Sequence, residues 1–403
     1  MKITAVETLR LGEFPNILFV QVHTDEGVVG LGETFMGAAA VEAYIHETAA
    51  PYLLGEDATF IERHARHLRG YLGAGATGAE TRGNSAIDIA LWDIAGKNAG
   101  QPLHQILGGS CRDDVRVYNT CAGPRYIRSR PVQQVDNWGL PGAQGGELYE
   151  DLEGFLHHAD ELALSLLEQG VSAMKIWPFD RFAERHDGQG ITAGELEEGL
   201  EPLRRIRSAV GNRMDVMIEF HSLWNLPAAG RIMRALDQYE PFWYEDPVKM
   251  DDGDALAALS RQVRVPIAAS ETLAGRRAFR RLLEQHVPFV VMLDVSWAGG
   301  VSEAKKIAAM AEAYQLPVTL HDCTGPVVLT ASTHLSLHLP NALIQEMVRA
   351  FYYGWYKDLV TELPHVENGR IRPPGGAGLG TELQPGVRKR ADCIRRETKW
   401  SDA

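Results

Sequence analysis

The most constraining feature of this sequence is a series of short apolar runs that begins near residue 115. Eight runs follow one another along the chain: VRVYNT, AMKIW, VMIEF, FWYED, PIAAS, VVMLD, PVTLH and ALIQE. Amphipathic stretches such as LEEGLEPLRRIRSAVG and VSEAKKIAAMAEAYQ lie between them. Buried strands that alternate with helices predict a parallel sheet. Repetition of this unit favours an α/β fold in which the sheet closes into a (β/α)8-type barrel, a modified TIM barrel.

The N-terminal part of the chain follows another pattern. The stretch ILFVQVHTDEGVVGLGET predicts a hairpin, and AVEAYIHETAAPYLLGED and GNSAIDIALWDIAGKNAGQPLHQILGG have the apolar spacing of helices. We therefore expect an α+β capping domain over residues 1–113 and a barrel domain over residues 114–362. The Pro- and Gly-rich segment 363–403 is expected to return to the capping domain.

Composition and charge narrow the classes of partner. A formal net charge of −13 argues against binding to nucleic acid or anionic membranes. No apolar run reaches the roughly 18 residues of a membrane span, and the N-terminus has no signal-peptide core. The cysteines form no CxxC pair, which predicts free thiols in a reducing compartment. They are Cys111, Cys121, Cys323 and Cys393. We expect a cytoplasmic protein that binds neither nucleic acid nor membrane.

Carboxylates occur where three successive strands of the predicted barrel end. Glu219, Glu245 and Glu271 are spaced 26 residues apart, about one strand–helix unit. The carboxyl ends of barrel strands meet at one rim, where active sites lie. Three like charges there would repel one another, and an all-oxygen ligand set favours Mg²⁺ as the cation that relieves the repulsion. Asp246, which follows Glu245, is expected to point away into the barrel wall.

The strands that follow end in groups suited to proton transfer. Asp294 ends VVMLD, and His321 ends PVTLH on the neighbouring strand. A carboxylate beside an imidazole fixes the ring tautomer and raises its basicity, which predicts a general base. Glu346 follows on the last strand, and Lys175 places a cation on the second. The alternative for each residue is a structural hydrogen bond at a strand end.

The stretch VMIEFHSLWN places Glu219 and His221 two residues apart. If the strand continues through both, their side chains share one face. His221 would then stand beside a metal ligand. The alternative is that both side chains face water where the strand ends.

A long segment, residues 123–147, follows the first strand of the predicted barrel. It is rich in Gly and Pro and carries Trp138 and three arginines. A loop of this length in a compact domain is more often functional than idle, so we expect it on the rim that carries the site. The alternative is a plain surface insertion. Candidates for binding the far end of an anionic substrate, with a solvated surface role as the alternative, are Arg125, Arg128, Arg130 and Arg276.

With these residues in place, the sequence resembles the enolase superfamily, and within it the mandelate racemase-like subgroup. The resemblance extends over nearly the whole chain, including SAIDIALWDIAGKNAGQPLHQILGG, the strand-end carboxylates and the closing GAGLGTEL. It implies that the three strand-end glutamates bind Mg²⁺ and that Asp294 and His321 form a dyad base. It also implies that Glu346, in its protonated form, donates a hydrogen bond to an enolate oxygen.

Two details of the resemblance bear on the reaction. Racemases of the group carry a Lys-x-Lys pair on the second strand, whereas here Trp177 stands in place of the second lysine after Lys175. The carboxylate-x-His pattern on the third strand is similar to that of acid-sugar dehydratases acting on galactonate or mannonate. In that role His221 protonates the departing hydroxyl. The resemblance therefore implies a Mg²⁺-dependent dehydratase that forms a 2-keto-3-deoxy sugar acid.

Other activities remain compatible with the same residues. An epimerase or racemase would use His221 as a base on the opposite face of the carbon. A cycloisomerase would expel a ring oxygen from a lactone or an anhydro ring. A non-catalytic sugar-acid binding protein would keep only the metal. In each case the expected partner is a small anionic sugar acid, and the resemblance implies a homo-oligomer, either a dimer or an octamer.

Overall fold

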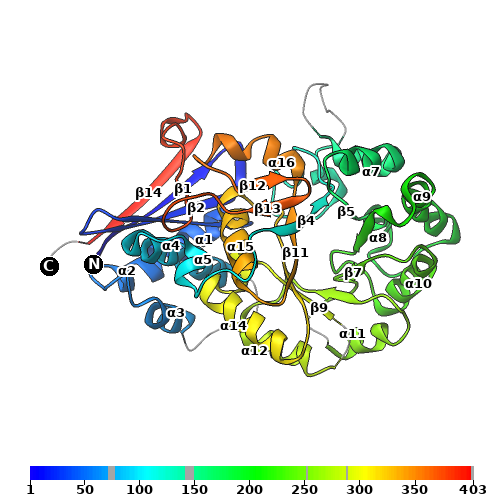
Figure 1. The fold of residues 1–403 in the computed structure, drawn as a ribbon, viewed down its shortest axis with the longest axis horizontal. Helices are drawn as coiled ribbons and strands as arrows, with labels where there is room; N and C mark the ends of the chain where they lie inside the picture. The colour runs from blue at the N-terminus through cyan, green and yellow to red at the C-terminus, as the bar shows by residue number, and fades with distance from the viewer. Residues whose placement is uncertain (71–77, 141–148, 251–252, 287–288, 401–403) are drawn as a thin grey trace.

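The chain forms two packed units, a capping domain and a barrel, in the computed structural model shown in Figure 1. The structure describes residues 1–70, 78–140, 149–250, 253–286 and 289–400. The first strand and the last strand lie side by side in the capping domain (Figure 1). Across the described part of the chain, no helix combines the length and apolar character needed to cross a bilayer.

The capping domain contains an antiparallel sheet with the strand order β14-β1-β2-β3. Its strands are β1 (Ile3–Leu11), β2 (Phe14–Thr24), β3 (Val29–Phe35) and β14 (Cys393–Lys399). Helix α4 (Ala79–Ala99) packs against β3. A Cβ on Gly32 would lie 1.9 Å from the carbonyl oxygen of Ala86, so glycine is required for this close approach. The sheet and its helices confirm the predicted α+β cap.

The other helices of the cap are short. They are α1 (Ala38–Tyr44), which continues through a π-helical turn (Ile45–Ala49) into α2 (Ala50–Leu53), followed by α3 (Ile61–Arg69) and α5 (Leu103–Ile106). Alternate residues of β1 and β2, including Val6 and Val20, point toward these helices and form a separate apolar core with Ile87 and Leu91 of α4.

Eight parallel strands close into a barrel, because β11 pairs back with β4. The strands are β4 (Val115–Thr120), β5 (Ala173–Ile176), β6 (Asp215–Glu219), β7 (Trp243–Glu245), β8 (Ile267–Ala269), β9 (Phe289–Leu293), β10 (Val318–Leu320) and β11 (Ala342–Met347). Each predicted apolar run supplies one strand, so the predicted barrel is confirmed. Side chains such as Tyr118, Met217, Trp243 and Met292 fill the interior. The barrel is therefore a packed core, and chemistry is confined to its rims.

Helices surround the strands on the outside of the barrel (Figure 1). They are α6 (Asp151–His157), α7 (Ala159–Glu168), α8 (Asp180–His186), α9 (Ala193–Val210), α10 (Leu226–Leu236), α11 (Gly253–Ser260), α12 (Gly275–Leu283), α13 (Val295–Ala298), α14 (Gly300–Ala313), α15 (Pro326–His338) and α16 (Arg349–Tyr353). Local sequence fixes where some of them begin. Thr192 and Glu195 form a capping box at the start of α9, and the side chain of Asn225 caps α10.

The C-terminal segment has contacts with both units: its first part joins the barrel sheet, and its later part lies against the capping domain. The hairpin of β12 (His365–Glu367) and β13 (Arg370–Arg372) extends the barrel sheet, since β13 pairs with β4. The later part lies against the cap: the backbone N–H of Leu379 donates to Asp93 of α4 at 2.8 Å, and β14 pairs with β1. Arg388 donates hydrogen bonds to Glu7 of β1 at 2.5 Å and helps to hold this return.

The capping domain docks on the rim where β9 and β10 end. Glu33 of β3 is buried and accepts hydrogen bonds from the backbone N–H groups of Val327 and Val328, at the start of α15, at 3.1 and 3.4 Å. The indole of Trp297 on α13 donates to the carbonyl of Phe35 at 3.1 Å. These contacts place the end of β3 next to residues that follow the barrel strands.

Glu33→Gln tests the energetics of this docking. Burial raises the pKa of Glu33 to about 8. The carboxyl therefore contributes stability that is fully present below its ordinary pKa and is lost as the pH rises through about 8. Glutamine keeps one acceptor oxygen, enough for one of the two backbone N–H groups, and does not ionise. The thermal stability of the variant should therefore fall less steeply than that of the wild type between about pH 5 and 8. Scanning calorimetry at several pH values measures the melting temperature of both proteins. The same slope of melting temperature against pH in the wild type and in Glu33→Gln would contradict this prediction.

Candidate active site

Three carboxylates converge at the carboxyl ends of β6, β7 and β8. Glu219 and Glu245 end their strands and are paired neighbours in the sheet register, and Glu271 stands two residues beyond β8. One carboxylate oxygen from each lies within 4.8 Å of the other two. All three side chains are buried. The sequence spacing thus predicted a cluster that the structure brings together.

The cluster has more negative charge than its protein neighbours compensate. Burial and the charge of Glu271 raise the pKa of Glu219 to about 8, and burial and the charge of Glu219 raise the pKa of Glu245 well above its ordinary value. Lys175 on β5 supplies one cation, with its Nζ 2.5 Å from Glu245 and 3.6 Å from Glu219. Oxygen Oε2 of Glu271 is buried and has no hydrogen-bond partner among the described residues.

These properties fit a hard divalent cation. The donors are all carboxylate oxygens, which Mg²⁺ prefers, and a cation would compensate the repulsion among them. Asp246 is buried beside the cluster, but its Oδ2 accepts a hydrogen bond from Ser270 at 2.5 Å. It is not one of the three residues whose oxygens converge.

Asp294 and His321 meet beyond the ends of β9 and β10, with Nδ1 of the ring 2.8 Å from Oδ2 of the carboxylate. The other oxygen of Asp294 accepts from the backbone N–H and the hydroxyl of Ser296, both at 2.7 Å, which fixes the carboxylate. Burial lowers the pKa of His321, but Glu346, Glu271 and Asp294 outweigh it and raise the pKa to about 10. The ring can act as a base only when this surrounding negative charge is compensated.

Glu346 of β11 is surrounded by donors. It accepts hydrogen bonds from Lys175 and Tyr118, each at 2.9 Å, from the backbone N–H of Asp322 at 3.0 Å and from Thr120. Burial raises its pKa, but the Lys175 and His321 charges outweigh this and lower it to about 2. The Lys175 and His321 charges thus favour the ionised form in this arrangement, whereas the protonated Glu346 that the resemblance implies stays a prediction. Tyr118 and Thr120 were missed, although strand alternation on β4 places them inward together.

His221 reaches the site by a different route from the one expected. Strand β6 ends at Glu219, and His221 and Ser222 have left-handed backbones with φ of 49° and 57°. The alternation rule therefore does not apply, because it holds only within a strand. The turn is held by the backbone N–H of His221, which donates to Oε1 of Glu219 at 2.6 Å. The imidazole contacts Asp180, the first residue of α8, with 2.6 Å between Nδ1 and Oδ2. Asp180 was missed.

The segment after β4 contributes two further groups that were missed. Nε2 of Gln133 lies 3.3 Å from Nδ1 of His221 and 2.6 Å from the hydroxyl of Tyr126. Tyr126 is buried, and its hydroxyl interacts electrostatically with Cys323, Asp180 and Glu219. This part of the segment lies over the rim, as expected; residues 141–147 of it lie outside the described residues.

The arginines proposed for the far end of a substrate have other partners. Arg128 pairs with Glu13 at 2.9 Å and Arg276 with Glu303 at 2.8 Å. Arg130 pairs with Asp136 in the same segment. These carboxylates compensate the three charges, which weakens the proposal that Arg128, Arg130 or Arg276 binds substrate.

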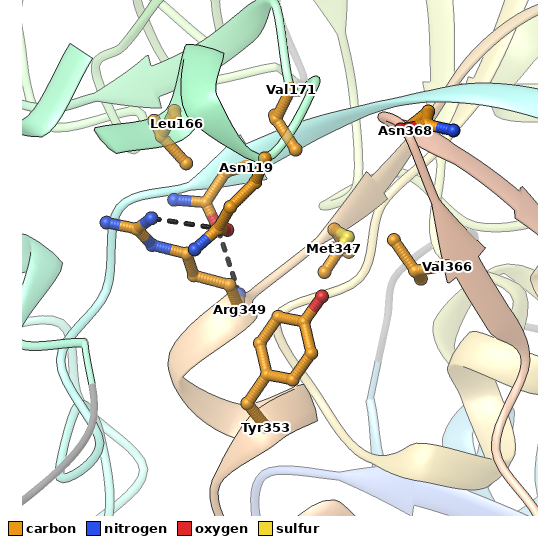
Figure 2. Close-up of a pocket in the computed structure, with 9 residues that line it drawn as sticks. Asn119, Leu166, Val171, Met347, Arg349, Tyr353, Val366 and Asn368 are labelled. Atoms are coloured by element: carbon orange, nitrogen blue, oxygen red, sulfur yellow. Dashed lines mark hydrogen bonds between the residues drawn. The ribbon is translucent and has the colours of Figure 1, made fainter. Parts of the chain in front are cut away.

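A cavity of about 220 Å³ lies apart from this site. Figure 2 shows Arg349, Asn119, Met347 and Tyr353 among its lining residues. Asn119 and Met347 are on outward-facing positions of β4 and β11, so the cavity lies on the outer wall of the barrel. The guanidinium of Arg349 is bound by both oxygens of Asp151, at 2.6 and 2.7 Å, which leaves no uncompensated charge there.

Two family models match the two units of the chain. The one described as mandelate racemase / muconate lactonizing enzyme, N-terminal domain, matches residues 4–108. The one described as enolase C-terminal domain-like matches residues 158–387.

Individual proteins are similar over nearly the full length. A D-galactonate dehydratase from Ralstonia nicotianae is 32% identical, covering 100% of this chain and 98% of that protein. A D-xylonate dehydratase from Haloferax volcanii is 31% identical, covering 95% of this chain and 87% of that protein. The crystal structure of an enolase of the mandelate racemase subgroup from Agrobacterium tumefaciens is 52% identical, covers 99% of both chains and superposes with a TM-score of 0.88.

The charge of the carboxylate cluster predicts that binding of Mg²⁺ is coupled to the release of protons. Because the pKa of Glu219 is raised to about 8, a cation must displace a proton from the cluster below that pH. Mg²⁺ affinity should rise by roughly tenfold per pH unit for each proton displaced as the pH approaches 8 from below. Isothermal titration calorimetry in buffers of different ionisation enthalpy measures both the affinity and the released protons. Binding that neither depends on pH nor releases protons would contradict this.

Proposed function

Because this chain belongs to the enolase superfamily, in its mandelate racemase subgroup, we propose that it is a Mg²⁺-dependent acid-sugar dehydratase. It removes the proton α to the substrate carboxylate and eliminates the 3-hydroxyl, which gives a 2-keto-3-deoxy sugar acid. The observation that carries the proposal is a pair of imidazoles, His321 and His221, which lie on opposite sides of the glutamate cluster. Each imidazole contacts a carboxylate of its own. The relatives named D-galactonate and D-xylonate dehydratase support it.

Glu219, Glu245 and Glu271 would hold the cation. When bound, Mg²⁺ supplies Lewis-acid stabilisation of the negative charge that develops on the substrate carboxylate as the α-proton leaves. Lys175 adds a fixed positive charge beside the same position, because its Nζ lies between Glu245 and Glu346. Glu346 in its ionised form holds that ammonium in place.

His321 takes the C2 proton. Asp294 accepts the Nδ1 hydrogen bond at 2.8 Å, so the other ring nitrogen, Nε2, is the one available to the substrate. Trp297 packs against the ring, with 5.3 Å between the ring centroids, and keeps bulk water from that side. General base catalysis of this kind contributes about 10²- to 10⁴-fold to the rate.

His221 donates a proton to the departing 3-hydroxyl. Strands β6 and β10 are four positions apart in the closed ring of eight, so the residues that follow them face each other across the mouth of the barrel. An acid and a base on opposite sides suit loss of the hydroxyl from the face opposite the departing proton. Trp177 occupies the place after β5 where racemases of the group carry a second lysine, so β5 offers no second base there.

Epimerisation at C2 is the second candidate. It is favoured by one observation: His221 has a carboxylate partner just as His321 does, so it too can serve as a base. The two activities differ in their products, since epimerisation yields no keto acid.

The proposal is tested by incubating the wild-type enzyme and Mg²⁺ with a panel of aldonates and aldarates. Semicarbazide detects 2-keto products, and proton NMR in D₂O detects exchange at C2. Dehydration predicts a 2-keto-3-deoxy acid from at least one member of the panel. Inversion at C2 without a keto product would show an epimerase. Neither turnover nor exchange with any acid that binds would show a sugar-acid binding protein.

Two variants separate the roles of the histidines. His321→Asn should lose both dehydration and C2 exchange, by about 10²- to 10⁴-fold, because both need the base. His221→Asn should lose dehydration by a similar factor but retain exchange, because the proton can leave and return without loss of water. NMR in D₂O follows both reactions in one sample. A fully active His221→Asn enzyme would contradict its role as the acid.

A further inference from the structure

Asp180 and His221 form the second carboxylate–imidazole pair of the site. The proposed function gives His221 a role but assigns none to Asp180. Asp180 is the first residue of α8 and is 3% exposed. Its Oδ2 lies 2.6 Å from Nδ1 of His221, closer than the 2.8 Å between Asp294 and His321. The oxygens of Asp180 do not belong to the glutamate cluster.

The surroundings of Asp180 leave it few other functions. Its Oδ1 is buried without a hydrogen-bond partner among the described residues. The adjacent Arg181 pairs instead with Glu198, at 2.9 Å. The amide of Gln133 is 3.4 Å from Oδ2 and is a weaker, neutral contact. Among the described residues, the imidazole of His221 therefore makes the shortest contact with this carboxylate.

Trp177 and Gln133 contact the ring of His221, but neither of them determines which ring nitrogen carries the hydrogen. Trp177 packs edge-on against it, with 5.7 Å between centroids and 79° between planes. Gln133 lies near both ring nitrogens, at 3.3 and 3.4 Å, and so does not distinguish them. Asp180 contacts Nδ1 alone. A carboxylate can only accept from a ring N–H, so it selects the form with hydrogen on Nδ1.

We propose that Asp180 is a positioning residue that fixes the orientation and tautomer of His221, so that Nε2 faces the substrate hydroxyl. This role rests on the proposed function, in which His221 delivers a proton to the leaving group. Asp180 does not touch the substrate in this role. It holds the Nδ1 hydrogen in both protonation states of the ring, so that the proton that moves is always the one on Nε2.

Asp180→Leu tests the proposal by removing the acceptor while filling a similar volume. Dehydration should fall by about 10²- to 10⁴-fold, the range found when a general acid–base histidine is lost or misoriented. C2 exchange and Mg²⁺ affinity should stay close to the wild type, and KM should change little. Asp180→Asn preserves the packing, but its amide can donate to Nδ1 as well as accept, so it should lose the tautomer selection and dehydrate about as slowly as Asp180→Leu. The matched control is Glu184→Leu: Glu184 is on the same helix, contacts the backbone of Val135 at 3.0 Å, and does not contact His221.

A double variant distinguishes positioning from general support of the fold. Asp180→Leu combined with His221→Asn should dehydrate no more slowly than His221→Asn alone, because Asp180 acts only through the ring. A further loss in the double variant would overturn the proposal. So would wild-type dehydration by Asp180→Leu, or an equal loss of exchange and dehydration.

A substrate-free readout keeps this test separate from that of the proposed function. In protein labelled with ¹⁵N-histidine, the His221 signal, assigned by its absence in His221→Asn, should show a protonated Nδ1 with a strongly deshielded proton. That proton signal should disappear in Asp180→Leu and persist in Glu184→Leu. Its persistence in Asp180→Leu would overturn the proposal whatever the reaction is. A wild-type enzyme that dehydrates no acid sugar, but shows this signal pattern, would instead count against the proposed function alone.

Discussion

Mutual repulsion among three buried carboxylates is the constraint on which the rest of the site depends. Glu219, Glu245 and Glu271 are brought within 4.8 Å of one another by strand pairing, which the barrel fixes independently of charge. Only one ammonium, that of Lys175, directly opposes them among the described residues. The raised pKa values of Glu219 and Glu245 express the cost of this arrangement, and a divalent cation is the species that removes it.

The negative charge of this region also shifts the pKa of the neighbouring base, His321. It raises the pKa of His321 to about 10, so the base becomes available only when that field is compensated. A cation bound to the glutamates would compensate this field and so lower the pKa of His321. The capping domain closes one side of this region, through Glu33 and the contact of Trp297 with Phe35. The segment after β4 brings Tyr126 and Gln133 over another side.

Sequence reasoning succeeded where one periodicity controls the structure. The recurrence of apolar runs predicted every barrel strand, and the 26-residue spacing predicted the cluster of glutamates, because strand ends of a closed parallel barrel share one rim. It was less successful where a turn replaces a strand. Residue His221 lies beyond the end of β6 in a left-handed turn, so alternation did not determine its direction.

Other parts of the structure depend on contacts between segments distant in sequence, which periodicity does not report. Asp180 meets His221 across 41 positions of the chain, and nothing in the stretch WPFD marks it beyond its place just after β5. The lowered pKa of Glu346 follows from the Lys175 and His321 charges, and its hydrogen bonds come from β4, β5 and the turn after β10. The division of the C-terminal segment between the barrel and the cap depends on the pairing of short edge strands.

Whether the three glutamates form a cation site can be measured by anomalous diffraction from crystals grown with Mn²⁺ in place of Mg²⁺. We expect one strong anomalous peak within bonding distance of an oxygen from each of Glu219, Glu245 and Glu271, and its loss in Glu245→Gln. A peak bound by Asp246 or Asp294 instead, or no peak at this rim at saturating Mn²⁺, would show that the glutamates are not the cation site.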